Sequence, residues 1–245
     1  MPSYPLRGKV ALVTGGARRV GRALALELAR AGADLAFTYK DSVAEATTLL
    51  RELEVLGIRA CTLPCDLRSE SSVCEAVGKT VSEFGRLDLL VNNAAVFESG
   101  ELATLDVEAW DRVFETNTRG PFLISREALP HLKATHGRIV NLGSLGGLRS
   151  WPTHAHYCAS KAALHSLTQS MARAFAPEVT VNCIAPGFIE FEEDRGDRSM
   201  HFAARTPLGR NGRAEEVAEA LLFFATGPTY ITGQILAVDG GLGLV

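Results

Sequence analysis

A tyrosine, a lysine and a serine in the second half of the chain have the residue types and the spacing for proton transfer. Tyr157 precedes Lys161 by four positions in a segment of helical character, so both side chains share one helix face. A phenol, with an ordinary pKa of about 10, is a poor acid–base group at neutral pH unless a cation such as the Lys161 ammonium stabilises its phenolate. Tyr157 can then protonate a developing alkoxide, or deprotonate an alcohol in reverse. The Ser144 hydroxyl can hydrogen-bond the same oxygen.

The elements that must position these residues alternate between short apolar segments and longer segments of helical period. Strands are expected at residues 9–14, 33–39, 58–63, 87–92, 138–142, 179–184 and 235–238. Helices are expected at 20–31, 44–56, 71–84, 107–134 (with a break near Gly120), 157–175 and 215–225. Near-continuous apolar strands between helices predict a parallel sheet covered on both faces. With right-handed crossovers, this is a doubly wound, Rossmann-like α/β fold of about seven strands, with Ser144 at its ligand-binding edge.

The chain is expected to form one domain over residues 1–245, because it contains no linker, repeat or low-complexity tract. The segment 188–213 has no clear period and is densely charged. It is either a solvated surface loop or a mobile lid over the site, since long loops inside compact domains are commonly functional.

The composition is that of an ordinary globular chain: 47% of the 245 residues are hydrophobic and 22% are charged, with a net charge of −3. No run of like charges forms an arm for nucleic acid, so nucleic acid is not an expected partner. Residues 1–9 lack a signal-peptide pattern, and no apolar stretch approaches the ~18 residues of a membrane span. The five scattered cysteines have no histidine at ligand spacing. We therefore expect reduced thiols, no metal site and a cytoplasmic protein.

A glycine-containing turn between the first expected strand and the first expected helix has the pattern of a dinucleotide site. Residues 14–21 read TGGARRVG. Glycines let the backbone approach a pyrophosphate, and the helix N-terminus supplies free N–H groups. Such turns also occur without a ligand, but the strand–turn–helix context favours a cofactor. The expected contacts in the turn are Gly15, Arg18, Arg19, Val20 and Gly21.

The end of the second expected strand bears on the choice between NADP(H) and NAD(H). Sites for NAD commonly place an acidic residue there, to bind the ribose hydroxyls. Tyr39 takes that position here, followed by Lys40 and, two residues later, Ser42. A cation with hydroxyl groups suits a 2′-phosphate, so NADP(H) is favoured. NAD(H) stays an alternative, because a register shift of one residue would make Asp41 the ribose ligand.

Several motifs in one order resemble those of the short-chain dehydrogenases/reductases, from about residue 9 to residue 241. The turn at 14–21 resembles the family's TGxxxGxG, residues 92–95 its NNAG and residues 238–241 its VDGG. Ser144, Tyr157 and Lys161 have the family's spacing. The resemblance implies that Asn117 joins them and anchors a water-linked proton relay to the lysine. It also implies further cofactor contacts, namely Asp66, Leu67, Asn93, Ala94, Ala95, Tyr157, Lys161, Pro186, Gly187 and Ile189.

Two positions, Arg19 and Phe191, depart from the family pattern. Arg19 stands in place of the middle glycine of the turn, a variant that resembles pteridine reductases, in which the arginine lies beside cofactor phosphate and substrate. Those reductases generally carry an aspartate where this chain has Ser144, and residues 141–161 look more like 3-oxoacyl-carrier-protein reductases. Phe191 lies near a position where many members have a threonine that contacts the nicotinamide carboxamide.

Four aromatic or imidazole side chains lie near these motifs in the sequence. His154 and His156 flank Tyr157 and are expected at the pocket rim or the surface rather than in catalysis. Trp151 and Phe97 are candidate apolar walls of the substrate pocket, although either could simply be packed.

The function expected from the residues and the resemblance is NADPH-dependent reduction of a small carbonyl substrate, a ketone or a 3-oxoacyl thioester, with Tyr157 as proton donor. The alternatives are a pteridine reductase acting on dihydrobiopterin or dihydrofolate, an NAD-dependent alcohol dehydrogenase, and a catalytically silent NADP-binding sensor. A sensor has no chemical use for a phenol paired with an ammonium. Family members assemble through the helices that correspond to 107–134 and 157–175, so the resemblance also implies a homotetramer.

Overall fold

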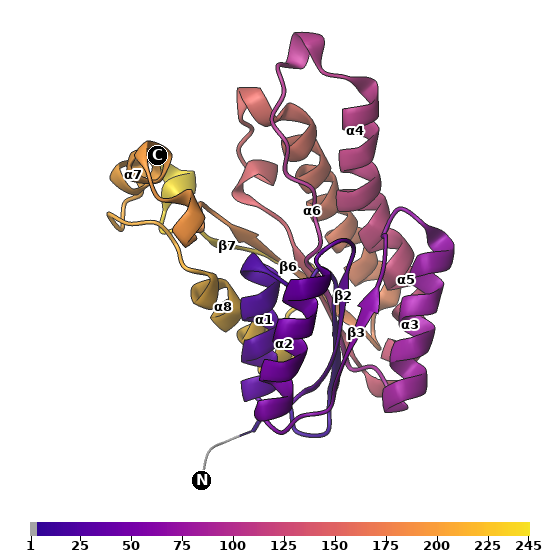
Figure 1. The fold of residues 1–245 in the computed structure, drawn as a ribbon. Helices are drawn as coiled ribbons and strands as arrows, with labels where there is room; N and C mark the ends of the chain where they lie inside the picture. The colour runs from indigo at the N-terminus through magenta and orange to yellow at the C-terminus, as the bar shows by residue number, and fades with distance from the viewer. Residues whose placement is uncertain (1–3) are drawn as a thin grey trace.

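Seven parallel strands form one sheet in residues 4–245, the part of the chain that the computed structural model describes (Figure 1). The strands are β1 Val10–Val13, β2 Asp34–Tyr39, β3 Ala60–Pro64, β4 Leu89–Asn92, β5 Arg138–Leu142, β6 Thr180–Pro186 and β7 Ile235–Val238. Their order is β3-β2-β1-β4-β5-β6-β7. The chain therefore winds outward from β1 in one direction and from β4 in the other, which confirms the doubly wound fold. The first three residues of the expected domain, and of the segment 1–9, lie outside the described range.

Helices cover both faces of the sheet (Figure 1). They are α1 Arg19–Arg30, α2 Val43–Val55, α3 Glu70–Phe84, α4 Val107–Phe114, α5 Gly120–Thr135, α6 Ala155–Phe175, α7 Asp197–Arg205 and α8 Ala214–Thr226. One buried cluster joins α1, α2 and α8 to the sheet, and a second joins α3, α5 and α6 to its other face. Strands such as β1 (VALV) are buried along their whole length because both faces are covered, which explains why they carry no polar alternation.

The long helical segment that begins at Val107 is not broken at Gly120. The chain passes from α4 through a π-helical turn, Glu115–Arg119, directly into α5, and Gly120 keeps right-handed helical angles (φ −56°, ψ −54°). Pro121 follows in the first turn of α5, where a missing N–H is best tolerated. The Gly-Pro pair therefore marks a change of helix type rather than a break.

The segment 188–213 also differs from the expectation, because it contains the helix α7 and a short 3₁₀ turn, Glu192–Asp194. Ser199 in α7 and Thr206, the residue that follows the helix, are buried, and Phe202 is half-buried. Ser199 donates to the carboxylate of Glu190 and accepts from the Asn211 amide. The helix has only nine residues and is polar on average, so it gives little apolar signal in the sequence although its faces differ.

Candidate active site

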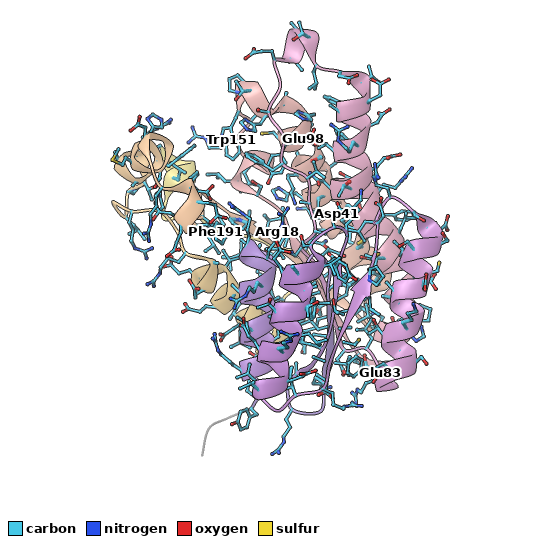
Figure 2. The ribbon with its side chains drawn as sticks, viewed as in Figure 1. Arg18, Asp41, Glu83, Glu98, Trp151 and Phe191 are labelled. Atoms are coloured by element: carbon cyan, nitrogen blue, oxygen red, sulfur yellow. The ribbon has the colours of Figure 1, made fainter. Side chains whose placement is uncertain are left out.

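A single cleft of about 1480 Å³ at the carboxyl ends of the strands brings the expected residues together. All the catalytic and cofactor residues expected above lie in the described part of the chain. All of them except Asn117 line the cleft. Arg18, Phe191 and Trp151 all line the cleft, and Figure 2 shows the first two in the lower part of this region and Trp151 above them. The cleft thus has a turn end and an aromatic end, with Tyr157 between them.

Helix α6 presents Tyr157 and Lys161 to the cleft beside the loop that follows β5. The Lys161 Nζ donates a 2.6 Å hydrogen bond to the carbonyl of Leu142, and lies 5.9 Å from the centre of the Tyr157 ring. The Ser144 hydroxyl is hydrogen-bonded to Tyr157. Ser144 Oγ also accepts a hydrogen bond from the Gly146 N–H at 3.0 Å. The hydroxyl proton of Ser144 therefore remains available for another acceptor. Phenol, hydroxyl and ammonium are therefore assembled on one wall of the cleft.

The electrostatics of this wall keep the phenol protonated. Burial raises the pKa of Tyr157 to about 12, against the opposing effect of the Ser144 hydrogen bond. Burial also lowers the pKa of Lys161 to about 8, which leaves the ammonium mainly charged at pH 7. Tyr157 therefore carries its proton at neutral pH, beside a cation of the kind that stabilises a phenolate.

Asn117 lies behind the cleft wall, in the π-helical turn between α4 and α5. Its amide exchanges two hydrogen bonds with the backbone of Val96, at 2.8 and 2.9 Å, and donates to Ser160 Oγ at 3.1 Å. Thr118 bonds the Ser160 carbonyl as well, so the turn is tied to α6 one residue before Lys161. π-turns inside helices are frequent at functional sites. Asn117 holds the strand-end loop against the catalytic helix, and its contacts do not include a direct bond to Lys161.

His165 is a buried residue of this region that the sequence patterns did not single out. It lies one helical turn after Lys161, and its Nε2 accepts a long hydrogen bond (3.5 Å) from the Ser144 N–H. Burial first, and then the Lys161 charge, lowers its pKa to about 4, so the ring is neutral and can accept. The loop reaches α6 only because residue 147 has no side chain: a Cβ on Gly147 would lie 2.6 Å from the His165 ring.

The glycine turn is held in place by its neighbours. Thr14 Oγ1 accepts from the N–H groups of Asn93 and Ala94, both at 3.0 Å, and the Asn93 amide donates to the carbonyls of Thr14 and Gly15. Gly15 has φ +61°, and a Cβ there would lie 2.9 Å from that of Ala94. The N-terminus of α1 has no side-chain cap and faces the cleft. The turn therefore fits a pyrophosphate held by helix N–H groups, as a dinucleotide requires.

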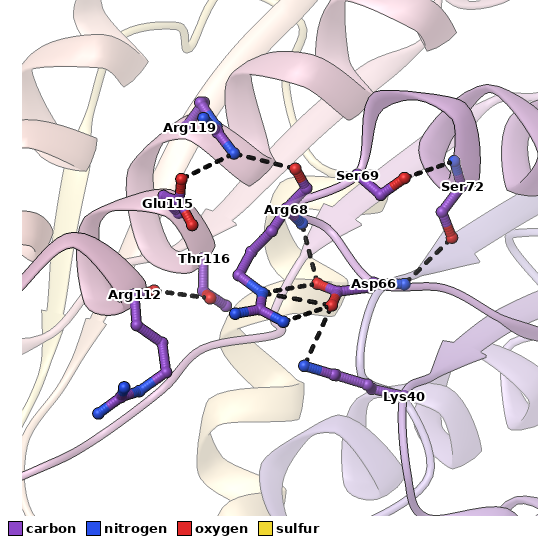
Figure 3. A network of polar contacts seen from close by, with 9 residues as sticks. All are labelled: Lys40, Asp66, Arg68, Ser69, Ser72, Arg112, Glu115, Thr116 and Arg119. Carbon is purple, nitrogen blue, oxygen red and sulfur yellow. Dashed lines mark hydrogen bonds and ion pairs between the residues drawn. The ribbon is translucent and has the colours of Figure 1, made fainter. Parts of the chain in front are cut away.

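Three cations surround the neighbouring end of the cleft, where Tyr39, Asp41 and Ser42 also contribute to the lining. Lys40 lies 3.1 Å from the carboxylate of Asp66, and Arg68 holds the same carboxylate with both arms of its guanidinium (Figure 3). These bonds, above all those from Arg68, hold the pKa of Asp66 well below its usual range. Arg68, which the sequence analysis missed, joins Arg18 and Lys40 at this end of the cleft, beside the carboxylates of Asp41, Glu45 and Asp66. Three cations are thus present where a 2′-phosphate would need positive partners.

Arg19 joins the turn to the segment 188–213. Its guanidinium lies 2.6 Å from the carboxylates of Glu193 and Asp194, and 4.1 Å above the ring of Phe191. Arg19 has a left-handed backbone (φ 51°). It therefore contacts the lid segment at the position where the family pattern has a glycine. Pro186 and Gly187 at the end of β6, with Ile189 beyond them, line the cleft on the same side.

The aromatic end contains the expected walls and further rings. Phe97 and Trp151 line the cleft there, and Phe188, Phe202 and Leu242, which the sequence analysis did not name, lie on it too. His154 is buried rather than at the surface and does not line the cleft; its ring stacks on Phe97 with ring centres 4.6 Å apart. His156 is neither at the rim nor at the surface: it is fully buried on the inner side of α6. The helical period places residue 156 on a different face from Tyr157.

Comparison with known proteins agrees with this geometry. The family model described as enoyl-(acyl carrier protein) reductase matches residues 15–243. The short chain dehydrogenase mdpC of Emericella nidulans is 37% identical, over 97% of this chain and 96% of that protein. The chain belongs to the short-chain dehydrogenase/reductase family. The 3-oxoacyl-[acyl-carrier-protein] reductase FabG of Thermotoga maritima is 36% identical, over 97% of this chain and 98% of that one.

Solved structures of the family superpose along almost the whole chain. A short-chain dehydrogenase/reductase of Serratia marcescens has a TM-score of 0.93 at 38% identity, covering 98% of this chain and 99% of that one. A short chain dehydrogenase of Burkholderia cenocepacia in complex with NADP has a TM-score of 0.91 at 38% identity, covering 97% and 99%. The chain is thus an oxidoreductase of this family. Within residues 4–245, no cluster of three or more His, Cys, Asp or Glu side chains is placed to hold a metal, and no helix could span a bilayer.

Proposed function

We propose that this protein is an NADPH-dependent reductase of a carbonyl substrate in which Tyr157 donates the proton. The observation that carries the proposal is that Tyr157, Ser144 and Lys161 line one wall of the cleft that contains the glycine turn, with the Lys161 ammonium held by the Leu142 carbonyl. The 3-oxoacyl-[acyl-carrier-protein] reductases among the relatives support a ketone or 3-oxoacyl thioester as substrate.

NADP(H) is the cofactor, on two grounds. The Burkholderia cenocepacia structure is a complex with NADP, and a further relative, a blue fluorescent protein from a metagenomic library that is 37% identical, is a complex with NADPH. In this chain Arg18, Lys40 and Arg68 line the end of the cleft where a 2′-phosphate would be held, and the uncapped end of α1 would hold the pyrophosphate. Bound NADPH supplies the hydride for the carbonyl carbon.

The chain's own groups handle the proton and the developing charge. Tyr157 transfers its phenolic proton to the carbonyl oxygen, and Ser144, whose oxygen already accepts from Gly146, donates a hydrogen bond to that same oxygen. Lys161 stabilises the Tyr157 phenolate, while the Leu142 carbonyl fixes the ammonium in place. Asn117 and Ser160 hold α6 against the loop at Val96, so we assign Asn117 to positioning and to supporting the resupply of the proton.

Replacing the phenol tests the proposal. Tyr157→Phe should lower kcat by about 100-fold or more, as expected for a lost general acid, with NADPH binding near that of the unchanged protein. NADPH consumption with a ketone and with an acetoacetyl thioester, and binding by nicotinamide fluorescence, are the measurements. Unchanged turnover in the variant would remove Tyr157 from this role.

Ketone reduction is favoured over pterin reduction by the state of Arg19. In a pterin site this guanidinium would face the substrate, but here it is bonded to Glu193 and Asp194. Dihydrobiopterin should therefore be a poor substrate, and Arg19→Gly should leave ketone reduction in place. An oxidative role with NAD(H) would need Asp41 to bind the ribose, and tighter binding of NADH than NADPH would establish it.

We also propose a homotetramer. The structure leaves two apolar faces uncovered: one on α4 and α5, where Val107 and Phe122 are 67% and 41% exposed, and one near β7, where Leu236 is 39% exposed and Tyr230 fully exposed. Two separate self-complementary faces are what a tetramer of paired dimers requires. Sedimentation as a monomer at micromolar concentration would contradict the assignment.

A further inference from the structure

The wall of the cleft around the Tyr157 hydroxyl is built mainly from aromatic rings. The edge of Phe97 meets the Tyr157 ring at a centre distance of 4.7 Å. The Trp151 ring lies nearly parallel to that of Tyr157, with 12° between the planes and 6.5 Å between the centres. About half of the Phe97 surface is exposed, at a position that lines the cleft. Ring surface is thus presented beside the proton donor.

A second set of rings lines the same cleft from the lid segment. Phe188, just after β6, and Phe202, in α7, are stacked with centres 4.6 Å apart and 14° between their planes. These two segments are separate in the chain from those that carry Phe97 and Trp151. Four segments therefore each bring an aromatic ring to one cleft. Rings arranged in this way favour offset-stacked or edge-to-face contacts with another flat ring.

Two cations that line the cleft, Arg112 at the aromatic end and Arg19 at the turn end, are already paired. Arg112 is bonded through both arms of its guanidinium to the carboxylate of Glu98, and this holds the pKa of Glu98 below its usual range. On the lid side, Arg19 is bonded to Glu193 and Asp194. A substrate carboxylate or phosphate would have to displace a carboxylate from one of these pairs. The polar groups left for the substrate are the hydroxyls of Tyr157 and Ser144, which suit one neutral oxygen.

We propose that the substrate is an uncharged carbonyl compound with an aromatic ring system, whose flat ring packs among Phe97, Trp151, Phe188 and Phe202 while its oxygen meets Tyr157. The inference rests on the proposed carbonyl-reductase function and specifies its substrate class. Phe97 and Trp151 are then specificity-determining residues, since they contact the ring rather than the reacting oxygen.

A pair of ketones with the same skeleton tests the inference. 2-Tetralone and 2-decalone are both bicyclic ten-carbon ketones, and in neither is the carbonyl conjugated to the second ring, so their chemical reactivity is comparable. The kcat/KM with NADPH should be about ten-fold or more higher for 2-tetralone, the gain expected from one or two ring contacts. Calorimetric titration of both ketones into the protein with NADP should show the same order of affinity. Equal or reversed preference in these measurements would overturn the inference.

Substitution of the rings separates this inference from the proposed function. Phe97→Leu and Trp151→Leu keep an apolar side chain and should reduce the ratio of kcat/KM for 2-tetralone to kcat/KM for 2-decalone about five-fold or more, whatever their effect on the rate that the two ketones share. NADPH binding monitors folding, and Phe223→Leu on the exposed surface of α8 is the matched control. If both ketones are reduced and the preference survives both substitutions, the aromatic assignment is wrong. If neither ketone nor the thioester is reduced, the proposed function itself fails.

Discussion

Arg19 and Glu193 are 174 residues apart in the chain, yet the guanidinium of the first lies 2.6 Å from the carboxylate of the second. Asp194 binds the other arm of the same guanidinium, and both acids line the cleft beside the glycine turn. The lid segment thus places two negative charges next to the expected position of the cofactor phosphates. The acids hold the lid against the turn and, at the same time, repel the group that the turn is built to bind.

Removing both lid acids should therefore strengthen cofactor binding. Glu193→Gln combined with Asp194→Asn is expected to lower the KM for NADPH by about three- to ten-fold at low ionic strength, and by less at high salt, because exposed charges are screened. Glu192→Gln removes one negative charge from the same 3₁₀ turn without touching either ion pair, and serves as the control for the loss of charge alone. A higher KM in the double variant would mean that the lid contact assists binding instead.

The pH dependence of reduction should report Lys161. Burial lowers its pKa to about 8, so the ammonium loses its proton as the pH rises through that value, whereas Tyr157, with a pKa of about 12, stays protonated. The kcat/KM for the carbonyl substrate is expected to be constant up to about pH 7.5 and to fall above about pH 8. Lys161→Arg keeps its charge in this range, so its lower rate should not fall there. A fall at the same pH in that variant would assign it to another group.

A methyl group at position 147 should disturb the active-site loop. A Cβ on Gly147 would lie 2.6 Å from the His165 ring and 2.8 Å from the carbonyl carbon of Lys161, so the loop that carries Ser144 must move. Gly147→Ala is expected to lower kcat/KM by about ten-fold or more, because the Ser144 hydroxyl leaves its position. Gly78→Ala in α3 meets nothing within 4 Å and should leave activity unchanged while stabilising the fold slightly. Equal activity of the two variants would show that the loop tolerates the shift.

Asp88 should contribute to stability through a pH-dependent network far from the cleft. Burial opposes its charge, but hydrogen bonds from Arg86, the Val10 N–H and Lys9 outweigh it and lower the pKa of the carboxyl. A depressed pKa gives stability above the unfolded value of about 3.9, and that stability is lost as the pH falls through the folded pKa. Asp88→Asn is expected to cost about 1–3 kcal/mol in urea unfolding at pH 7, with a smaller difference below about pH 4. A difference independent of pH would exclude the ionised form as its source.

The strands and most helices were predictable from the sequence because their signals are local. β5 and β7 have the bounds expected from their apolar runs, and α1, α3 and α6 begin within two residues of expectation. The sequence missed α7, whose buried Ser199 and neighbouring Thr206 find their hydrogen bonds within the segment. A helix of nine residues with few apolar side chains is too short and too polar to stand out from a charged loop in the sequence.

Part of the candidate site was likewise predictable from the sequence, and part was not. The glycine turn, Tyr157, Lys161 and Ser144 could be named because short motifs and fixed helical spacing bring their own neighbours together. Arg68 and His165 could not, since each acquires its role from a contact that no short motif describes. His165 reaches Ser144 across 21 residues, and Arg68 lies beside Lys40 only through the Asp66 carboxylate.

The sequence by itself determined the order of strands and helices, the turn and the catalytic set, since each depends on residues a few positions apart. Tertiary structure decided which charges neutralise one another and which rings share a wall. Arg19 pairs with the lid acids, Asn117 lies behind the cleft rather than in it, and Phe97 and Phe202 line the same cleft. These relations depend on distances in space between segments far apart in the chain, and such distances exist only once the sheet and its helices have packed.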